Sequence, residues 1–176
     1  MKAIVIYKSK YGSTKQYAQW IAEELGCNAV ERNDIKPEEL SSYDTIVYGG
    51  GLYAEVINGV SLITKNFDKL KGKKIAVFST GITPIEIRGY YDDYVIKKNF
   101  KDTSMLDSIK VFNFLGKMKL DELSFVHRTA LKSLKKIMSG KENPTEMEKL
   151  LVELCDADGD FSDRAAIRPL VDYVKE

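Results

Sequence analysis

Hydroxyl side chains gather around one glycine near the start of the chain, in the octet Ser-Lys-Tyr-Gly-Ser-Thr-Lys-Gln at residues 9–16. Serine and threonine hydroxyls, together with the unpaired N–H groups at the start of a helix, can surround a phosphate with donors, and the helix dipole favours its charge. The glycine lets the backbone turn and approach closely. The alternative is that Ser13 only caps a helix and the lysines are solvated. The candidate phosphate-binding residues are Ser9, Lys10, Tyr11, Gly12, Ser13 and Thr14.

Two later segments have a similar composition, each directly after an apolar run. Three consecutive glycines at 49–51 predict positive φ angles or the close approach of a ligand, and Tyr53 can stack on a planar ring or pack on the protein. Residues 79–84 again place hydroxyls around a glycine. We infer one site, with a phosphate at one end and a flat group across the other two segments. Its further candidate residues are Gly49, Gly50, Gly51, Leu52, Tyr53, Thr80, Gly81, Ile82 and Thr83.

Other site chemistries find little support in the sequence. Neither the G-x-G-x-x-G motif of dinucleotide-binding folds nor the G-x-x-x-x-G-K-S/T motif of nucleotide hydrolases occurs. The acidic segment 156–160 fails as a calcium loop because Phe161 stands where glycine is required. His127 is the single histidine, and a surface or packing role is favoured for it over catalysis. We therefore assign no catalytic acid or base and no metal ligand.

The elements that position these segments alternate between strands and helices. Apolar runs at 3–7, 45–48, 75–79 and 109–115, with a weaker run at 28–32, predict strands. A helical period from Tyr17 to Leu25 ends at Gly26, which fits a C-cap. Such alternation predicts a parallel sheet, and five strands fit the doubly wound α/β fold with strand order 2-1-3-4-5. Ligands in this fold bind at the carboxyl ends of the strands, where all three segments lie.

Residues 116–160 do not fit this minimal fold. They contain helical patterns at 121–138 and 145–154, and a last helix follows at about 162–175. The segment is too short to bury a strong core alone. The sequence therefore predicts a single domain, residues 1–176, with a helical insertion at about 116–160.

The three segments together resemble the flavodoxin family, whose first loop has the form Ser/Thr-x-Ser/Thr-Gly-x-Ser/Thr. Ser9, Gly12 and Thr14 match that loop, and Tyr11 stands where the family usually has a hydroxyl residue of smaller size. The resemblance implies a flavodoxin-like fold that binds flavin mononucleotide (FMN) without a covalent bond, with the phosphate at the first loop and the ring at the other two. It also implies electron transfer with a redox partner protein or a quinone.

The insertion resembles that of a subgroup, the menaquinone-dependent protoporphyrinogen oxidases, which carry an added helical segment before the last helix. The run Lys136 to Glu142 stands where that subgroup has a basic and apolar run ending in Ser-Gly-Gly. This likeness implies an alternative function, an FMN-dependent oxidoreductase linked to a quinone.

Composition restricts the partners and the location. The net charge of +1 gives no electrostatic footprint for nucleic acid. Two distant cysteines and the lack of a long apolar segment predict a cytoplasmic protein. Residues 117–141 combine basic side chains with an apolar stripe, so they either pack on the protein body or contact the inner face of a membrane. A membrane-surface adaptor without redox activity is the weaker alternative.

Overall fold

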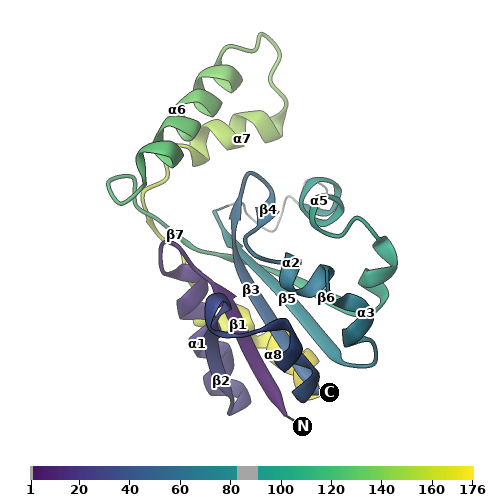
Figure 1. Cartoon of the computed structure of the whole chain (residues 1–176). Coiled ribbons are helices and arrows are strands. Elements are labelled where there is room, and N and C mark those ends of the chain that lie inside the picture. The colour runs from purple at the N-terminus through teal and green to yellow at the C-terminus, as the bar shows by residue number, and fades with distance from the viewer. Residues whose placement is uncertain (1, 83–90) are drawn as a thin grey trace.

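Five parallel strands form the central sheet of the computed structural model, which describes residues 2–82 and 91–176. The strand order β2-β1-β3-β5-β6 matches the predicted doubly wound order, because β4 is a short strand added to the end of β3 (Figure 1). Register pairs Ile4 with Ile46 and Ile46 with Ile75 across the centre of the sheet. The strands are β1 (Ala3–Lys8), β2 (Asn28–Glu31), β3 (Thr45–Tyr53), β4 (Val56–Ile57), β5 (Lys74–Gly81) and β6 (Ile109–Leu115).

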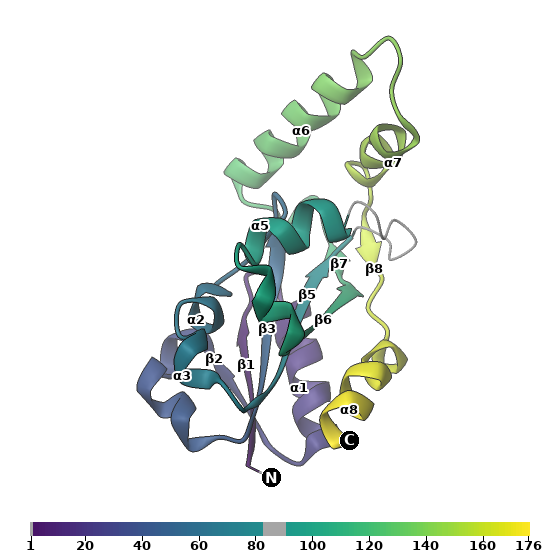
Figure 2. The same cartoon turned by 90° about the vertical axis from the view of Figure 1, so that its right-hand side faces the viewer.

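Helices cover both faces of this sheet. On one face α1 (Ser13–Leu25) and α8 (Arg168–Lys175) pack side by side, and on the other lie α2 (Ser61–Thr64), α3 (Phe67–Leu70) and α5 (Lys97–Asn99) (Figure 2). Successive strand residues alternate between the two cores, because side chains alternate across a strand. Short helical turns also occur at η1 (Arg32–Asp34), η2 (Pro37–Ser42), η3 (Tyr91–Ile96), η4 (Thr103–Asp107) and η5 (Arg164–Ile167).

The three glycines at 49–51 lie within β3, and of the two alternatives predicted for them, positive φ angles or the close approach of a ligand, the first is wrong. A Cβ atom on Gly49 would lie 2.1 Å from the Phe78 ring, so glycine is required here by packing against the neighbouring strand. Positive φ angles occur instead at Ala54 (46°) and Glu55 (67°), in the two-residue turn between β3 and β4. Lys98 Nζ donates to the carbonyl of Ala54 and secures this turn.

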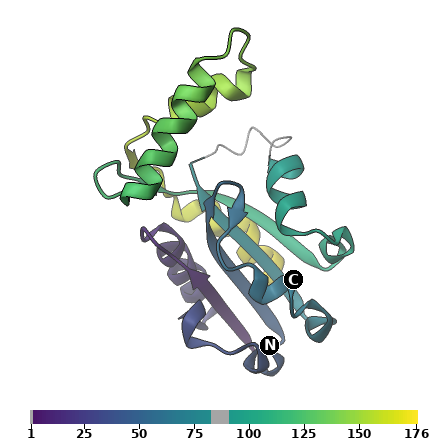
Figure 3. The same ribbon diagram turned by 45° about the horizontal axis from the view of Figure 1, so that its top comes forward.

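The insertion is a helical hairpin on a short stem. Strands β7 (Lys117–Met118) and β8 (Gly159–Asp160) pair in antiparallel fashion, and between them run α6 (Phe125–Ser139) and α7 (Glu146–Leu154). The hairpin stands beyond the carboxyl ends of the parallel strands (Figures 1 and 3). Helix α6 begins later than predicted because Ser124 is its N-cap, whose hydroxyl accepts from the His127 backbone N–H.

One tyrosine fixes both ends of the insertion to the body. Tyr17 Oη on α1 donates to the carbonyl of Leu115 at 2.7 Å and accepts from the backbone N–H of Asp163 at 2.9 Å. The N–H of Gly116 donates to the carbonyl of Gly81 at 2.7 Å. The chain therefore leaves the sheet and returns to it at the same place.

Candidate functional site

A cavity of about 490 Å³ lies at the carboxyl ends of β1, β3 and β5, beneath the helical hairpin. Its size is typical of small-molecule sites. One side comes from the sheet body and consists of Ser9, Tyr11, Ser13, Thr14, Gly51, Leu52, Tyr53, Ala54, Thr80, Gly81 and Ile82. The other comes from the insertion and consists of Gly116, Lys117, Met118, Lys119, Glu122, Leu123, His127, Ala130, Leu131 and Leu134.

A cluster of hydroxyls lines the sheet side of the cavity. Thr14 Oγ1 and Thr80 Oγ1 lie 2.7 Å apart, and both side chains are buried. Ser9 Oγ accepts from the backbone N–H of Gly12 at 3.1 Å, which holds the first loop in its turn. These contacts leave hydroxyl hydrogens available to an acceptor in the cavity.

The first turn of α1 is not capped by a side chain, so the alternative role of Ser13 as a helix cap is wrong. Gly12, with φ of 95°, occupies the cap position, and Ser13 Oγ instead accepts from the backbone N–H of Lys117 at 2.8 Å. Helix geometry leaves the first N–H groups of α1 without intrahelical acceptors. They provide donors and a favourable dipole for an anion at this loop.

Three aromatic rings form a second cluster in the lining. The ring of His127 lies 5.0 Å from that of Tyr53 and 5.6 Å from that of Tyr11, between centroids. Tyr11 and Tyr53 are 6.3 Å apart in an edge-on arrangement. A Cβ atom on Gly51 would lie 2.9 Å from the Tyr53 ring, so glycine at this position lets that ring lie close to the strand. The rings supply flat apolar surface beside the hydroxyls.

The titration of these groups is shifted by burial and by Lys10. Burial lowers the pKa of His127 below its ordinary value, and the Lys10 charge lowers it further. Burial tends to raise the pKa of Tyr11, but hydrogen bonds with Ser124 and the charge of Lys10 outweigh it and lower this pKa. Burial raises the pKa of Tyr53 to about 12, with Tyr11 adding to the effect. At neutral pH His127 is therefore predominantly an uncharged imidazole, and Tyr53 is a neutral phenol.

Most of the predicted site residues meet at this cavity. Of the first loop, Lys10 and Gly12 lie outside the lining, although Lys10 Nζ reaches Ser124 Oγ at 3.5 Å. Gly49 and Gly50 lie deeper in β3, where their neighbours leave no room for a side chain. Thr83 falls outside the described residues.

The sequence did not predict the side of the cavity that comes from the insertion. His127 approaches Tyr11 from 116 positions along the chain, and no local pattern marks that contact. Lys117 and Lys119 also line the cavity; Lys117 Nζ lies 3.0 Å from a Glu122 oxygen and Lys119 Nζ 3.8 Å from an Asp158 oxygen. Their pairing leaves little excess charge on the stem.

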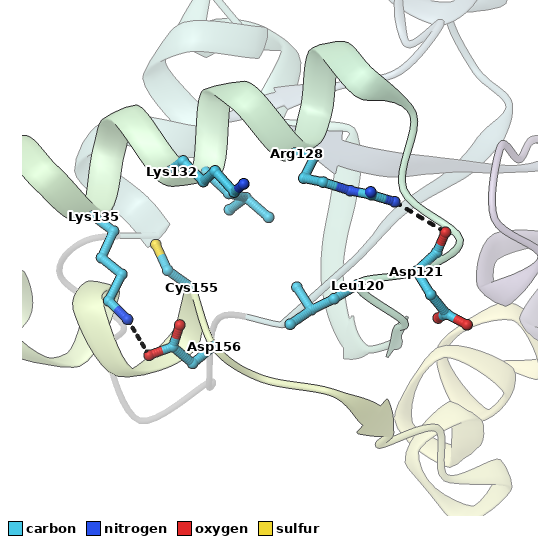
Figure 4. Close-up of a pocket in the computed structure, with 8 residues that line it drawn as sticks. Leu120, Asp121, Arg128, Lys132, Lys135, Cys155 and Asp156 are labelled. Atoms are coloured by element: carbon cyan, nitrogen blue, oxygen red, sulfur yellow. Dashed lines mark hydrogen bonds and ion pairs between the residues drawn. The ribbon is translucent and has the colours of Figure 1, made fainter.

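A second cavity, of about 340 Å³, lies inside the insertion (Figure 4). Arg128 donates to the carbonyl of Asp121 at 3.1 Å, and Lys135 pairs with Asp156. Burial raises the pKa of the Cys155 thiol and the Asp156 charge raises it further, so the thiol is a poor nucleophile. This cavity lacks a hydroxyl-rich loop, and we do not assign a site to it.

The structure also bears on metals and on membrane spans. Within residues 2–82 and 91–176, no group of three or more His, Cys, Asp or Glu side chains could hold a metal ion. None of the helices in this part of the chain is long and apolar enough to cross a membrane.

Comparison with known proteins identifies the family. The family model for the flavodoxin domain matches residues 4–146. The uncharacterized protein MJ0298 of Methanocaldococcus jannaschii is 33% identical over 87 residues. The match covers 48% of this chain and 57% of that relative, so the chain spans only part of the relative's length.

This chain is also similar to solved structures, among them the following three. A flavodoxin from the domain Archaea is 17% identical, with 89% of this chain and 97% of that one covered and a TM-score of 0.45. Oxidised flavodoxin 2 from Bacillus cereus is 21% identical (65% and 84% covered, TM-score 0.46). The Trp repressor binding protein from Bacillus subtilis is 15% identical (66% and 84% covered, TM-score 0.48). Because the family model matches most of the length of this chain, the chain belongs to the flavodoxin family.

Proposed function

We propose that the chain binds FMN without a covalent bond in the cavity of about 490 Å³ and uses it to transfer electrons. The observation that carries the proposal is that hydroxyls and aromatic rings line one cavity directly above the start of α1. A monophosphate needs one close turn and several N–H and hydroxyl donors, which the loop around Gly12 offers. A flavin ring needs flat apolar cover, which Tyr11 and Tyr53 offer.

The roles of the protein residues follow from this arrangement. Ser9, Ser13 and Thr14 would hold the phosphate, and residues 51–53 and 80–82 would surround the ring. FMN supplies the electron chemistry when bound, while the protein supplies binding, orientation and electrostatics.

Flavin binding can be tested with the purified protein. Protein purified with its cofactor is expected to show flavin absorbance, and protein stripped of it is expected to quench the fluorescence of added FMN with one-to-one stoichiometry. Protein that shows neither signal would refute the proposal. Riboflavin, which lacks the phosphate, serves as the matched ligand and is expected to bind more weakly.

A second candidate is an FMN-dependent oxidoreductase of the menaquinone-dependent protoporphyrinogen oxidase type. The observation that favours it is that Leu123, Leu131 and Leu134 of the insertion line the same cavity as the hydroxyl loop. This apolar side offers room for a small organic substrate next to the flavin. Turnover of protoporphyrinogen with a menaquinone analogue is the expected result, and a protein that reduces only a protein electron acceptor would remove this candidate.

A contact with an anionic membrane surface is the third candidate, with or without a flavin. Phe125, Val126 and Ile137 of α6 are 83%, 70% and 63% exposed, and residues 125–141 contain five Lys or Arg and no Asp or Glu. Exposed apolar side chains beside basic ones are typical of interfacial helices.

Lipid binding can be tested by co-sedimentation with phosphatidylglycerol vesicles and phosphatidylcholine vesicles. Binding to the anionic vesicles alone is expected, and Val126→Ser should weaken it. The control is Val56→Ser, which removes a valine that is 43% exposed on β4 of the sheet body. Equal loss in both variants would contradict the docking surface, and lipid binding by protein that takes up no FMN would favour an adaptor role.

A further inference from the structure

Tyr11 and His127 form a hydrogen bond inside the cavity. Tyr11 Oη lies 2.7 Å from His127 Nδ1, and both side chains line the cavity. The backbone N–H of Ser124 already donates to Tyr11 Oη at 3.3 Å. Tyr11 Oη lies farther from Ser124 Oγ, at 3.4 Å, so His127 Nδ1 is the better acceptor for the hydroxyl hydrogen. The neutral imidazole therefore carries its hydrogen on Nε2.

The surroundings of this pair stabilise negative charge on the tyrosine oxygen. Lys10 Nζ lies 5.5 Å from the centre of the Tyr11 ring, and the Ser124 N–H points at the oxygen. Ser124 is also the N-cap of α6, so the same residue orients Tyr11 and starts the helix that carries His127. The lowered pKa of Tyr11 agrees with this arrangement.

We propose that Tyr11 and His127 form a proton relay that serves an organic electron acceptor bound in this cavity. This inference rests on the proposed flavin function. Conversion of a quinone to a quinol takes up two electrons and two protons, and an anionic reduced flavin would supply both electrons and one proton as a hydride.

The relay delivers the second proton. The Nε2–H bond of His127 breaks as an O–H bond forms on the substrate oxygen, and the Tyr11 hydroxyl proton moves to Nδ1. Tyr11 is left as a phenolate, held by the Ser124 N–H and the Lys10 charge. When the product leaves, His127 Nε2 takes a proton from solvent and the Nδ1 proton returns to the Tyr11 oxygen, which restores the resting pair. An acceptor that takes up electrons without protons does not need the proton path through Tyr11 and His127.

The resting hydrogen bond can be tested without flavin, because the chain contains a single histidine. In ¹⁵N-labelled apoprotein at pH 8, the ring nitrogens of His127 are expected to show the Nε2–H tautomer. Tyr11→Phe should convert this to a mixture of tautomers, while Tyr173→Phe, the same change on α8, should not. An Nδ1–H tautomer in the wild type would overturn the relay.

The proton transfer can be tested by stopped-flow reoxidation of the reduced, FMN-loaded protein. The two acceptors are 1,4-benzoquinone, which takes up protons, and ferricyanide, which does not. The ratio of the quinone rate to the ferricyanide rate is expected to fall about 100-fold in Tyr11→Phe and His127→Gln, the lower end of general acid catalysis. The ratio should stay unchanged in Tyr173→Phe.

The two proposals fail in different ways. If the protein takes up no FMN, its absorbance spectrum lacks the flavin band before any mixing. That result would refute both the proposed function and the relay. FMN uptake with an unchanged rate ratio in both variants would remove the relay alone.

Discussion

The hydroxyl oxygens of Thr14 and Thr80 lie 2.7 Å apart, although the residues are 66 positions apart in the sequence. The contact joins the first turn of α1 to the end of β5. Both side chains are buried, with 2% and 6% of their surface exposed. The two loops at this edge of the sheet are thus held together by the same groups that face the cavity.

Thr14→Val should weaken both the fold and the site. Valine keeps the shape but leaves the Thr80 hydroxyl without this partner, which costs about 1–3 kcal/mol of unfolding free energy. FMN affinity should fall about tenfold, because the proposed phosphate site loses one hydroxyl donor. Urea unfolding and fluorescence titration with FMN measure the two effects. The control, Thr103→Val at an exposed position, should change neither, and an unaltered affinity in Thr14→Val would exclude this hydroxyl from the site.

Gly49→Ala should destabilise the protein by about 3 kcal/mol, at the upper end of overpacking costs. The added Cβ would lie 2.1 Å from Cζ of Phe78, with both strands fixed by the parallel sheet. The double variant Gly49→Ala with Phe78→Leu should lose less stability than the two single changes sum to, as measured by urea unfolding. Gly140→Ala, at a helix end with φ of −84°, is the matched control and should stay within about 0.5 kcal/mol of wild type. Additive losses of stability in the double variant would show that the Phe78 ring does not clash with the added Cβ of residue 49.

Stability should fall as pH drops below the ordinary pKa of histidine, 6.5. Burial first, and then the Lys10 charge, lower the pKa of His127 in the folded state, so the unfolded chain takes up this proton at a higher pH. The contribution of the neutral imidazole is present above pH 6.5 and is lost as pH falls through the lowered pKa.

The comparison of wild type with His127→Gln isolates this effect, because the carboxylates titrate alike in both. Urea midpoints at pH 8 and pH 5.5 should differ less in His127→Gln than in wild type. Lys10→Gln should raise the titration midpoint of His127 followed by NMR. Equal pH dependence in wild type and His127→Gln would show that the histidine is equally solvated in the folded and unfolded chains.

Tyr17→Phe should loosen the attachment of the insertion. The change leaves the Leu115 carbonyl and the Asp163 N–H without their partner in a buried position, at a cost of about 1–3 kcal/mol. Amide hydrogen exchange at Gly116 and Asp163 should accelerate more than exchange within β1. Tyr173→Phe on α8 provides the control, and uniform acceleration across the whole sheet would point to a general loss of stability instead.

The sheet and its order could be predicted from the sequence because they depend on local signals. Apolar runs mark the strands, and Gly26 marks the end of α1. The predicted strands begin within about a residue of their observed starts, but β3 continues to Tyr53, beyond the predicted end at 48. The last helix was predicted as one element, but it is divided into η5 and α8 at Arg168, where Pro169 follows in the first turn.

The site was predictable only where local pattern decides the geometry. The hydroxyl loop before α1 and the ends of β3 and β5 line one cavity, as the prediction that all three segments lie at the carboxyl ends of the strands requires. The glycines at 49–51 misled because glycine is also required where a neighbouring side chain fills the space, as Phe78 does, and that neighbour is distant in sequence. His127 went unrecognised for the same reason, since its contact with Tyr11 depends on how the hairpin folds over the sheet.

The closed stem of the insertion has a consequence for how such proteins can diversify. Since residues 117–118 pair with 159–160, the intervening segment can be replaced by another of different length without changing the paths of β6 or α8. Each doubling of a loop that starts and ends at one point costs only about 0.6 kcal/mol of closure entropy. Recombination at this stem would exchange the side of the cavity that faces a substrate while keeping the hydroxyl loop intact.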